Sequence, residues 1–173
     1  MTKFKFLFVI INFTILPLWG FTAMQNYHFQ LNWSDIEKVC TGENEYLSRL
    51  NFDGAEFDVS SPGTPLFFKK IKIDNQYNEL VVKIGSPVFK ALTSQEIFVL
   101  DNITAFPDEI IPDFSVASSS GQRYVMVNFL PFRLNTETGK YEKLLEFELV
   151  LEMRQGVKSG AVQGDFAEKS VLA

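Results

Sequence analysis

The chain has 173 residues, of which 46% are hydrophobic and 14% aromatic, with 18 Phe and a formal net charge of −5. The length suits one domain and the aromatic content favours strands, whereas the acidic balance argues against a nucleic-acid partner, which requires a basic face. With only one cysteine, Cys40, and one histidine, His28, the chain has no internal disulfide and no paired-cysteine zinc site.

Residues 1–23 have the pattern of a secretory signal peptide. Lys3 and Lys5 give a positive start, an apolar run covers residues 6–18, and small residues follow up to Ala23. The alternative is a membrane anchor, but polar residues and a proline interrupt the run, which is shorter than the roughly 20 apolar residues of a spanning helix. We therefore expect cleavage near Ala23 and export of the remaining chain.

Residues 27–33 alternate between apolar and polar side chains without a break, which predicts a strand with one wet face. His28 lies on the wet face, and we expect it to be neither catalytic nor a metal ligand because it has no partner histidine. The other face is expected to join the core, and it carries Tyr27, Phe29, Leu31 and Trp33.

The next stretch is polar and rich in turn signals. Residues 34–37 (SDIE) have a capping pattern that could open one helical turn. Cys40 is expected to be a buried or semi-buried structural thiol, since a nucleophile needs a base and an orienting group. Residues 62–65 (PGTP) predict a turn or an extended loop. The nearby carboxylates offer oxygen ligands for calcium without the spacing of an EF-hand, so we interpret them as a solvated rim: Asp53, Glu56 and Asp58.

Short apolar runs predict further strands at residues 66–73, 80–85, 88–92, 96–100 and 123–129. Pro87 separates the second run from the third and restricts them to an edge, a bulge or a strand start. Residues 101–121 read as a loop. No window of 12 or more residues has a clean helical period.

Residues 130–152 have the pattern of a β-hairpin whose polar turn ends at Gly139. In its second arm, Phe147, Leu149 and Leu151 alternate with mostly charged residues, which predicts one face on a core and one in water. The whole pattern predicts an all-β fold, an antiparallel β-sandwich in residues 24–153. Residues 154–173 have a linker composition and would lead to a missing downstream region.

No catalytic, cofactor-binding or metal-binding residue is predicted. The chain lacks phosphate-binding glycine loops and a nucleophile elbow, and Cys40 with His28 has no third group to complete a site. Paired carboxylates such as Asp108, Glu109 and Asp113 are common in any acidic chain and do not indicate a glycosidase.

Several stretches together resemble a known family. They are residues 50–57 (LNFDGAEF), 62–67 (PGTPLF), 130–145 (LPFRLNTETGKYEKLL) with 147–149, and 168–173 (EKSVLA). This set is similar to the N-terminal region of the type IX secretion sortase, PorU, of Bacteroidota, and to the propeptides of gingipain-type cysteine peptidases. The similarity covers most of residues 27–173.

The resemblance implies a β-sandwich prodomain of a longer cell-surface cysteine peptidase that removes C-terminal sorting signals and transfers cargo to lipopolysaccharide. The catalytic His and Cys of that family lie in a downstream domain, so neither His28 nor Cys40 matches them. Gingipain propeptides inhibit and help to fold their enzymes through a basic loop residue, but no Arg or Lys here is assigned to that role. The chain stops after Ala173, so it is expected to be a fragment, a truncated gene product or a free-standing prodomain-like protein.

We therefore predict a non-enzymatic exported domain without cofactors that serves folding, latency or assembly in protein secretion and surface anchoring. Its expected partners are a peptidase-like domain, in cis or in trans, and type IX secretion components, with membrane contact only through the signal segment. Its expected location is the periplasm, outer membrane or cell surface of a Gram-negative bacterium. Two alternatives are a carbohydrate- or surface-binding module, which would expose Trp33 in a groove, and an independent enzyme dependent on Cys40.

Overall fold

The computed structural model describes residues 22–42, 45–100 and 106–155, and these are mostly strand. The all-β prediction is therefore confirmed. In chain order the elements are β1 (Thr22–Gln30), β2 (Glu37–Gly42), β3 (Glu45–Arg49), β4 (Glu56–Asp58), β5 (Ser61–Ile73), β6 (Glu79–Ala91), α1 (Ser94–Val99), β7 (Asp113–Ser119), β8 (Gln122–Phe129), β9 (Phe132–Asn135) and β10 (Lys140–Arg154).

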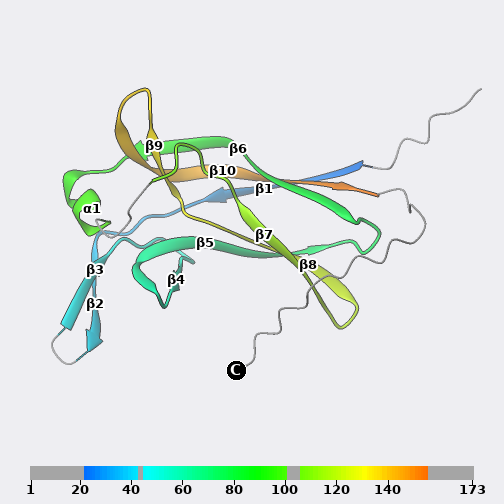
Figure 1. Ribbon diagram of the computed structural model, residues 1–173, viewed down its shortest axis with the longest axis horizontal. Coiled ribbons are helices and arrows are strands. Elements are labelled where there is room, and N and C mark those ends of the chain that lie inside the picture. The colour runs from blue at the N-terminus through cyan, green and yellow to red at the C-terminus, as the bar shows by residue number, and fades with distance from the viewer. Residues whose placement is uncertain (1–21, 43–44, 101–105, 156–173) are drawn as a thin grey trace, which may run out of the picture.

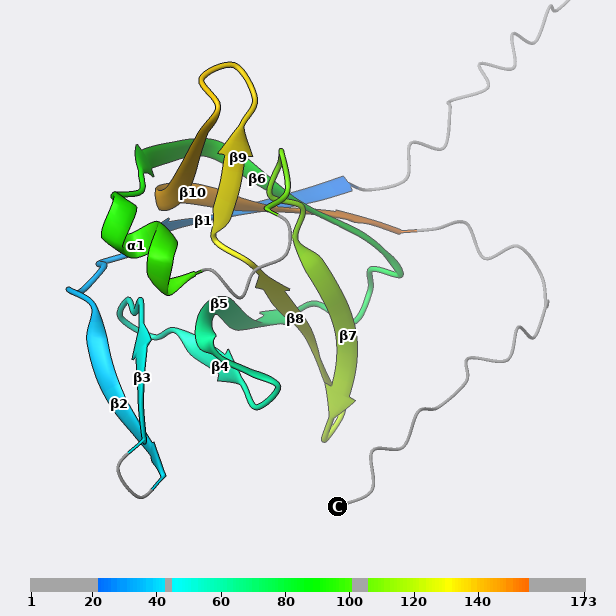
Figure 2. The same cartoon turned by 60° about the vertical axis from the view of Figure 1, so that its left-hand side comes forward.

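Two antiparallel sheets form the two layers of a sandwich (Figure 1). The first sheet has the order β1-β10-β6, and β9 also pairs with β10. The second sheet has the order β4-β5-β8-β7. The β2–β3 hairpin forms a separate ribbon at one end of the sandwich, beside α1 (Figure 2).

The core lies between the two sheets and is rich in aromatic rings. Phe147, Leu149 and Leu151 of β10 are fully buried, as the alternation of this arm predicted. From the opposite sheet, Phe67 places its ring centroid 5.2 Å from that of Phe147, in an edge-to-face arrangement. Burial of one such side chain contributes roughly 1.5–3 kcal/mol, so this inner face is a main source of the domain's stability.

The predicted hairpin is present as β9 and β10, with Lys140 paired to Asn135. Gly139 takes a φ of 65°, a conformation that glycine adopts without steric cost, and its N–H donates to the carbonyl of Asn135. The Asn135 side chain accepts hydrogen bonds from the N–H groups of Glu137 and Thr138. The turn residues therefore set the register of the two arms.

The stretch 62–65, predicted as a turn or loop, instead belongs to β5, and the chain reverses before it, at residues 59–60. Pro65 is tolerated there because, among the described strands, this part of β5 pairs only with the short edge strand β4, and pairing with β8 begins at Phe67. The runs 80–85 and 88–92 likewise join into the single strand β6, whose register shifts next to Pro87. β6 is an edge strand, so the positional prediction for Pro87 is confirmed.

Two short segments have the opposite structure to the one predicted. Residues 96–100 are not a strand, because α1 covers most of them and Thr93 caps its start. Residues 34–37 do not open a helix, because Ser34 N–H donates to the carbonyl of Asn51 and holds the segment extended. In addition, β7 forms within the stretch 101–121 that was expected to be a loop.

The predicted signal peptide lies almost wholly outside the described residues. Thr22 and Ala23 are the exception, since they begin β1 and pair with Arg154 and Met153. The predicted linker also lies outside, except for Arg154, which ends β10, and Gln155. Across the described ranges, no helix has the length and apolar character needed to cross a membrane.

Candidate functional site

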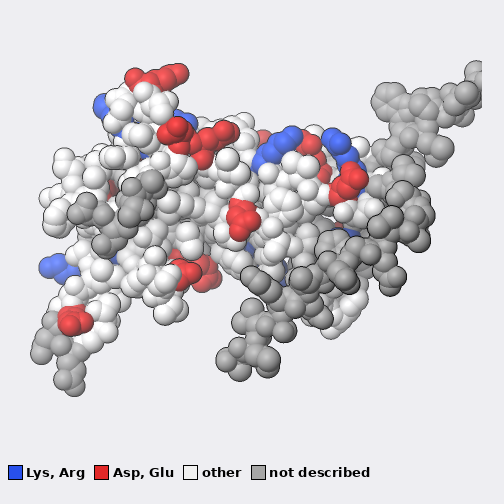
Figure 3. Space-filling view, in the orientation of Figure 1, with Lys and Arg blue, Asp and Glu red and all other residues white. Residues whose placement is uncertain are grey.

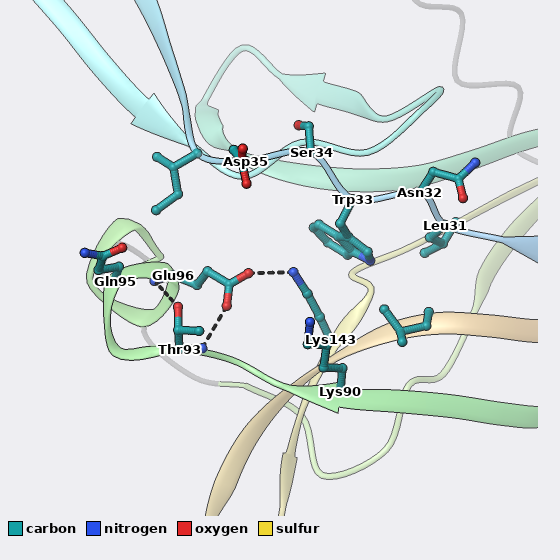
Figure 4. Close-up of a pocket in the computed structure, with 12 residues that line it drawn as sticks. Leu31, Asn32, Trp33, Ser34, Asp35, Lys90, Thr93, Gln95, Glu96 and Lys143 are labelled. Carbon is teal, nitrogen blue, oxygen red and sulfur yellow. Dashed lines mark hydrogen bonds and ion pairs between the residues drawn. The ribbon is translucent and has the colours of Figure 1, made fainter.

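A polar groove of about 810 Å³ lies where the end of the sandwich meets α1 (Figure 4). The segment between β1 and β2, residues 31–36, forms one wall. Lys90 at the end of β6 and Lys143 of β10 lie across from it, with α1 and its cap at the end. The groove thus joins segments that are far apart in the sequence.

An ion pair between Lys143 and Glu96 lies in this groove. The Lys143 ammonium is 2.5 Å from Oε1 of Glu96, and the two side chains are only 7% and 14% exposed. The other carboxylate oxygen of Glu96 accepts the Thr93 backbone N–H at 2.7 Å, and the Thr93 hydroxyl accepts the Glu96 N–H. This capping box gives hydrogen-bond acceptors to the N–H groups of Thr93 and Glu96 at the start of α1, while the ion pair attaches the helix to β10.

Opposing effects act on the Glu96 carboxyl. Burial by itself raises its pKa, but the hydrogen bonds from Lys143 and Thr93 outweigh burial and leave the pKa below the ordinary value of 4.5. Glu96 is therefore charged at neutral pH. The Lys143 ammonium also lies 5.0 Å from the centre of the Trp33 ring. The arrangement therefore holds an ion pair between α1 and β10 at the wall of the groove.

Trp33 forms a half-buried wall of the groove and is anchored in the core. Its indole Nε1–H donates to the carbonyl of Leu144 at 2.8 Å, and its ring centroid lies 4.9 Å from that of Phe52 and 5.2 Å from that of Phe132. The prediction of a core-facing Trp33 is confirmed. Trp33 therefore does not form the exposed aromatic platform expected of a carbohydrate-binding module.

The two residues considered for nucleophilic chemistry lie on separate sheets. His28 faces solvent on β1, as predicted, and its Nε2 is 3.6 Å from a Glu146 carboxylate oxygen. Cys40 lies on β2, and its thiol contacts the carbonyl of Gly42 at 3.0 Å. Cys40 is exposed, so the prediction of a buried or semi-buried thiol is wrong. The cause is that β2 belongs to the β2–β3 ribbon, which is separate from the sandwich, and Cys40 occupies an exposed position of that strand.

Two of the three acidic rim residues, Asp53 and Asp58, accept hydrogen bonds. Asp53 accepts a hydrogen bond from the Asn32 side chain. Asp58 accepts hydrogen bonds from the hydroxyl and the N–H of Ser60, which lower its pKa. In the described parts of the chain, no three His, Cys, Asp or Glu side chains come together in a group suited to a metal ion.

Two exposed aromatic residues extend this region beyond the groove. Phe98 on α1 is 79% exposed and Tyr46 on β3 is 70% exposed. A hollow of about 340 Å³ next to the groove is lined by Ile36, Ser48 and Val99 together with Phe98. We call the groove, this hollow and the two aromatic residues the α1 face. Sequence reasoning missed Phe98 because it placed residues 96–100 in a strand, although the Thr93–Glu96 capping box was visible.

No model of a known protein family and no curated protein matches this chain. Solved structures do match it. A chain from a study of the zymogenic latency of gingipain K from Porphyromonas gingivalis aligns with a TM-score of 0.55 at 13% identity, covering 78% of this chain and 88% of that chain. A chain from the complex of the RgpB pro- and mature domains of the same organism aligns with a TM-score of 0.47 at 15% identity, covering 80% and 86%. The gingipain K alignment identifies the fold as similar to that of a gingipain propeptide.

Proposed function

We propose that this chain is a non-catalytic, propeptide-like domain that binds a gingipain-type cysteine peptidase domain and serves its folding, latency or assembly. The observation that carries the proposal is the fold similarity to the gingipain K chain over 78% of this chain. The finer assignment is to the type IX secretion sortase, and the sequence resemblance supports it. Its most specific stretch, residues 130–145, is the β9–β10 hairpin with the turn at Gly139.

The proposal includes export by the segment 1–23 and function in the periplasm, the outer membrane or at the cell surface. Type IX secretion components are the further partners that this role implies. Lysine, arginine and acidic side chains lie intermixed on the face shown in Figure 3, which suits a protein partner better than a nucleic acid.

The α1 face is the proposed contact surface for the peptidase domain. Large exposed aromatic side chains are enriched at protein interfaces, and Phe98 lines the hollow that shares Ile36 and Gln95 with the groove. An extended segment of a partner can enter this groove. The groove offers charges of both signs, since Lys90 and Asp35 line it together with the Lys143–Glu96 pair. We assign these residues to binding, and none of them to catalysis.

A binding experiment with a purified peptidase domain tests the proposal. The probe is the catalytic domain of a gingipain-type sortase from the same genome, prepared without its own N-terminal region. We expect isothermal titration calorimetry to detect binding, and the chain to slow hydrolysis of a chromogenic peptide or to raise the refolding yield of the domain. Absence of binding, with no effect on hydrolysis or refolding, would overturn the proposal.

Matched variants locate the surface. Phe98→Ser is expected to weaken binding at least tenfold. Ile111→Ser removes a side chain of similar exposure, 77%, far along the chain on the approach to β7, and is expected to leave binding unchanged. Equal effects of the two variants would move the contact away from the α1 face. Cys40→Ser is expected to retain full binding, because the thiol has no assigned role.

A further inference from the structure

Two lysine side chains enter the groove from neighbouring strands. Lys90 of β6 lies directly opposite Lys143 of β10 in the antiparallel register, and both residues line the groove. Directly opposite residues of an antiparallel pair lie on the same face with their Cβ atoms about 4.5–5.5 Å apart, and like charges in this position are unfavourable. The two ammonium groups therefore concentrate positive charge on one wall of the groove, across from Asp35 (Figure 4).

Glu96 compensates only one of these two ammonium groups. Its Oε1 lies 2.5 Å from Nζ of Lys143, and its Oε2 accepts the Thr93 N–H at 2.7 Å, so both carboxylate oxygens are engaged. Lys90 is exposed, and within the described part of the chain no ion pair or hydrogen bond joins its ammonium to another residue. Lys90 therefore carries a charge that a ligand of opposite sign can compensate.

The groove continues into the hollow beside α1, which has a different chemistry. Gln95 and Ile36 line both cavities and so mark the passage between them. Gln95 is exposed, and its amide group can both donate a hydrogen bond to a peptide group and accept one from it. Beyond this passage, Phe98 and Val99 give the hollow an apolar lining. An occupant of both cavities therefore needs an anionic group near Lys90 and an apolar group beside Phe98.

We propose that the groove and the hollow bind an extended peptide segment with a carboxylate side chain next to Lys90 and an apolar side chain beside Phe98. This inference rests on the proposed function, because it names the kind of segment that the peptidase domain presents to the α1 face. A basic side chain at the same place would add a third positive charge beside Lys90 and Lys143, of which Glu96 compensates one. Asp35, on the other wall, can accept a backbone hydrogen bond from the segment.

A peptide titration of the full chain, followed by NMR, tests the proposal. The probe is the blocked pentapeptide Ac-Leu-Ala-Glu-Ala-Leu-amide, which has a leucine on each side of the glutamate and so can reach the hollow in either chain direction. Two control peptides have glutamine or lysine in place of the glutamate. We expect the acidic peptide to shift the indole N–H signal of Trp33, which lines the groove, and to bind with a Kd at least tenfold lower than either control. Equal constants for the three peptides, or tightest binding of the lysine peptide, would overturn the proposal.

Variants of the chain assign the two contacts. Lys90→Met removes the charge, and we expect it to bind the acidic and glutamine peptides equally. Lys72→Met, at an exposed lysine of β5 in the other sheet, is the matched control and should keep the tenfold preference. The urea midpoint of Lys90→Met should equal that of the unsubstituted chain, which separates lost binding from lost folding. A preference that persists in Lys90→Met would overturn the proposal.

Phe98→Ser tests the apolar contact. It should weaken binding of the acidic and glutamine peptides by the same factor, because it changes the hollow and leaves the charge at Lys90 in place. Unchanged affinity for both peptides would overturn the placement of the apolar side chain.

The peptide titration is independent of the test of the proposed function, because it contains no peptidase. If the peptidase domain binds but the three peptides bind equally, this inference fails and the proposed function stands. If the acidic peptide is preferred but the peptidase domain does not bind, the peptide site stands and its assignment to a peptidase fails.

Discussion

The ammonium of Lys143 and the carboxylate of Glu96 form a buried ion pair that connects the central strand β10 to the helix α1, 47 residues earlier in the chain. A charged pair in such a place is costly to desolvate, and it is strongly destabilising to break because the remaining charge is left without its partner. The pair therefore connects α1 to β10 within the groove that both residues line.

Lys143→Met is expected to destabilise the domain by about 2–3 kcal/mol, somewhat less than loss of a fully buried pair, because Glu96 retains its hydrogen bond from Thr93. Urea unfolding followed by circular dichroism measures this free energy. Lys83→Met is the control, since Lys83 lies 2.7 Å from Glu152 but is 56% exposed, and its loss should have a much smaller effect.

The double variant Lys143→Met with Glu96→Leu shows whether the single variant is unstable because it leaves an unpaired buried charge or because it loses the attraction between the two groups. Removal of both charges leaves no unpaired group, so we expect most of the lost free energy of unfolding to be recovered. A double variant at least as unstable as the sum of the two single variants would contradict this account of the pair.

Acidification is expected to destabilise the domain partly through Glu96. Its pKa in the folded protein lies below the ordinary value of 4.5, so the ionised form favours folding. The contribution is fully present above pH 4.5 and is lost as the pH falls through the lower folded pKa. The urea midpoint of the unsubstituted protein should therefore fall more steeply below pH 4.5 than that of Glu96→Gln. Parallel curves for the two proteins would rule out this linkage.

Phe147→Asp should unfold the domain. Phe147 is fully buried and its ring contacts the rings of Phe29, Phe67 and Phe129. An unpaired carboxylate at this position costs more than about 4 kcal/mol, a large part of the stability of an ordinary domain. A thermal melt followed by circular dichroism should show no cooperative transition. Glu148→Gln, one residue along on the outer face, should melt like the unsubstituted protein.

The sandwich core was predictable because its side chains alternate over whole strands. The inner face of β10, from Phe147 to Leu151, follows directly from period two, and so does the outward position of His28. The turn at Gly139 was also predictable, because its conformation depends on a few adjacent residues. Local patterns are sufficient where local chemistry decides the structure.

The α1 face was not predictable from such patterns, because contacts between distant segments create it. Lys143 reads as a charge on a strand, and only the fold brings it to Glu96. Residues 96–100 contain a short apolar run that suits a strand or a helix, and the capping box at Thr93 decided the outcome. Cys40 is exposed because the β2–β3 hairpin is separate from the sandwich, which alternation within that hairpin does not reveal.

The hairpin turn offers a test of backbone conformation without side-chain packing. A Cβ added at Gly139 meets no heavy atom within 4 Å, but the φ of 65° is unfavourable for any residue with a Cβ. We therefore expect Gly139→Ala to lower the free energy of unfolding by about 1 kcal/mol, the cost of left-handed backbone. Gly63→Ala is the control, because its Cβ would make only ordinary contact with Leu47 at 3.7 Å and its backbone is not left-handed. The urea midpoint of Gly139→Ala should lie below that of Gly63→Ala. An unchanged midpoint for Gly139→Ala would show that the turn does not hold this conformation.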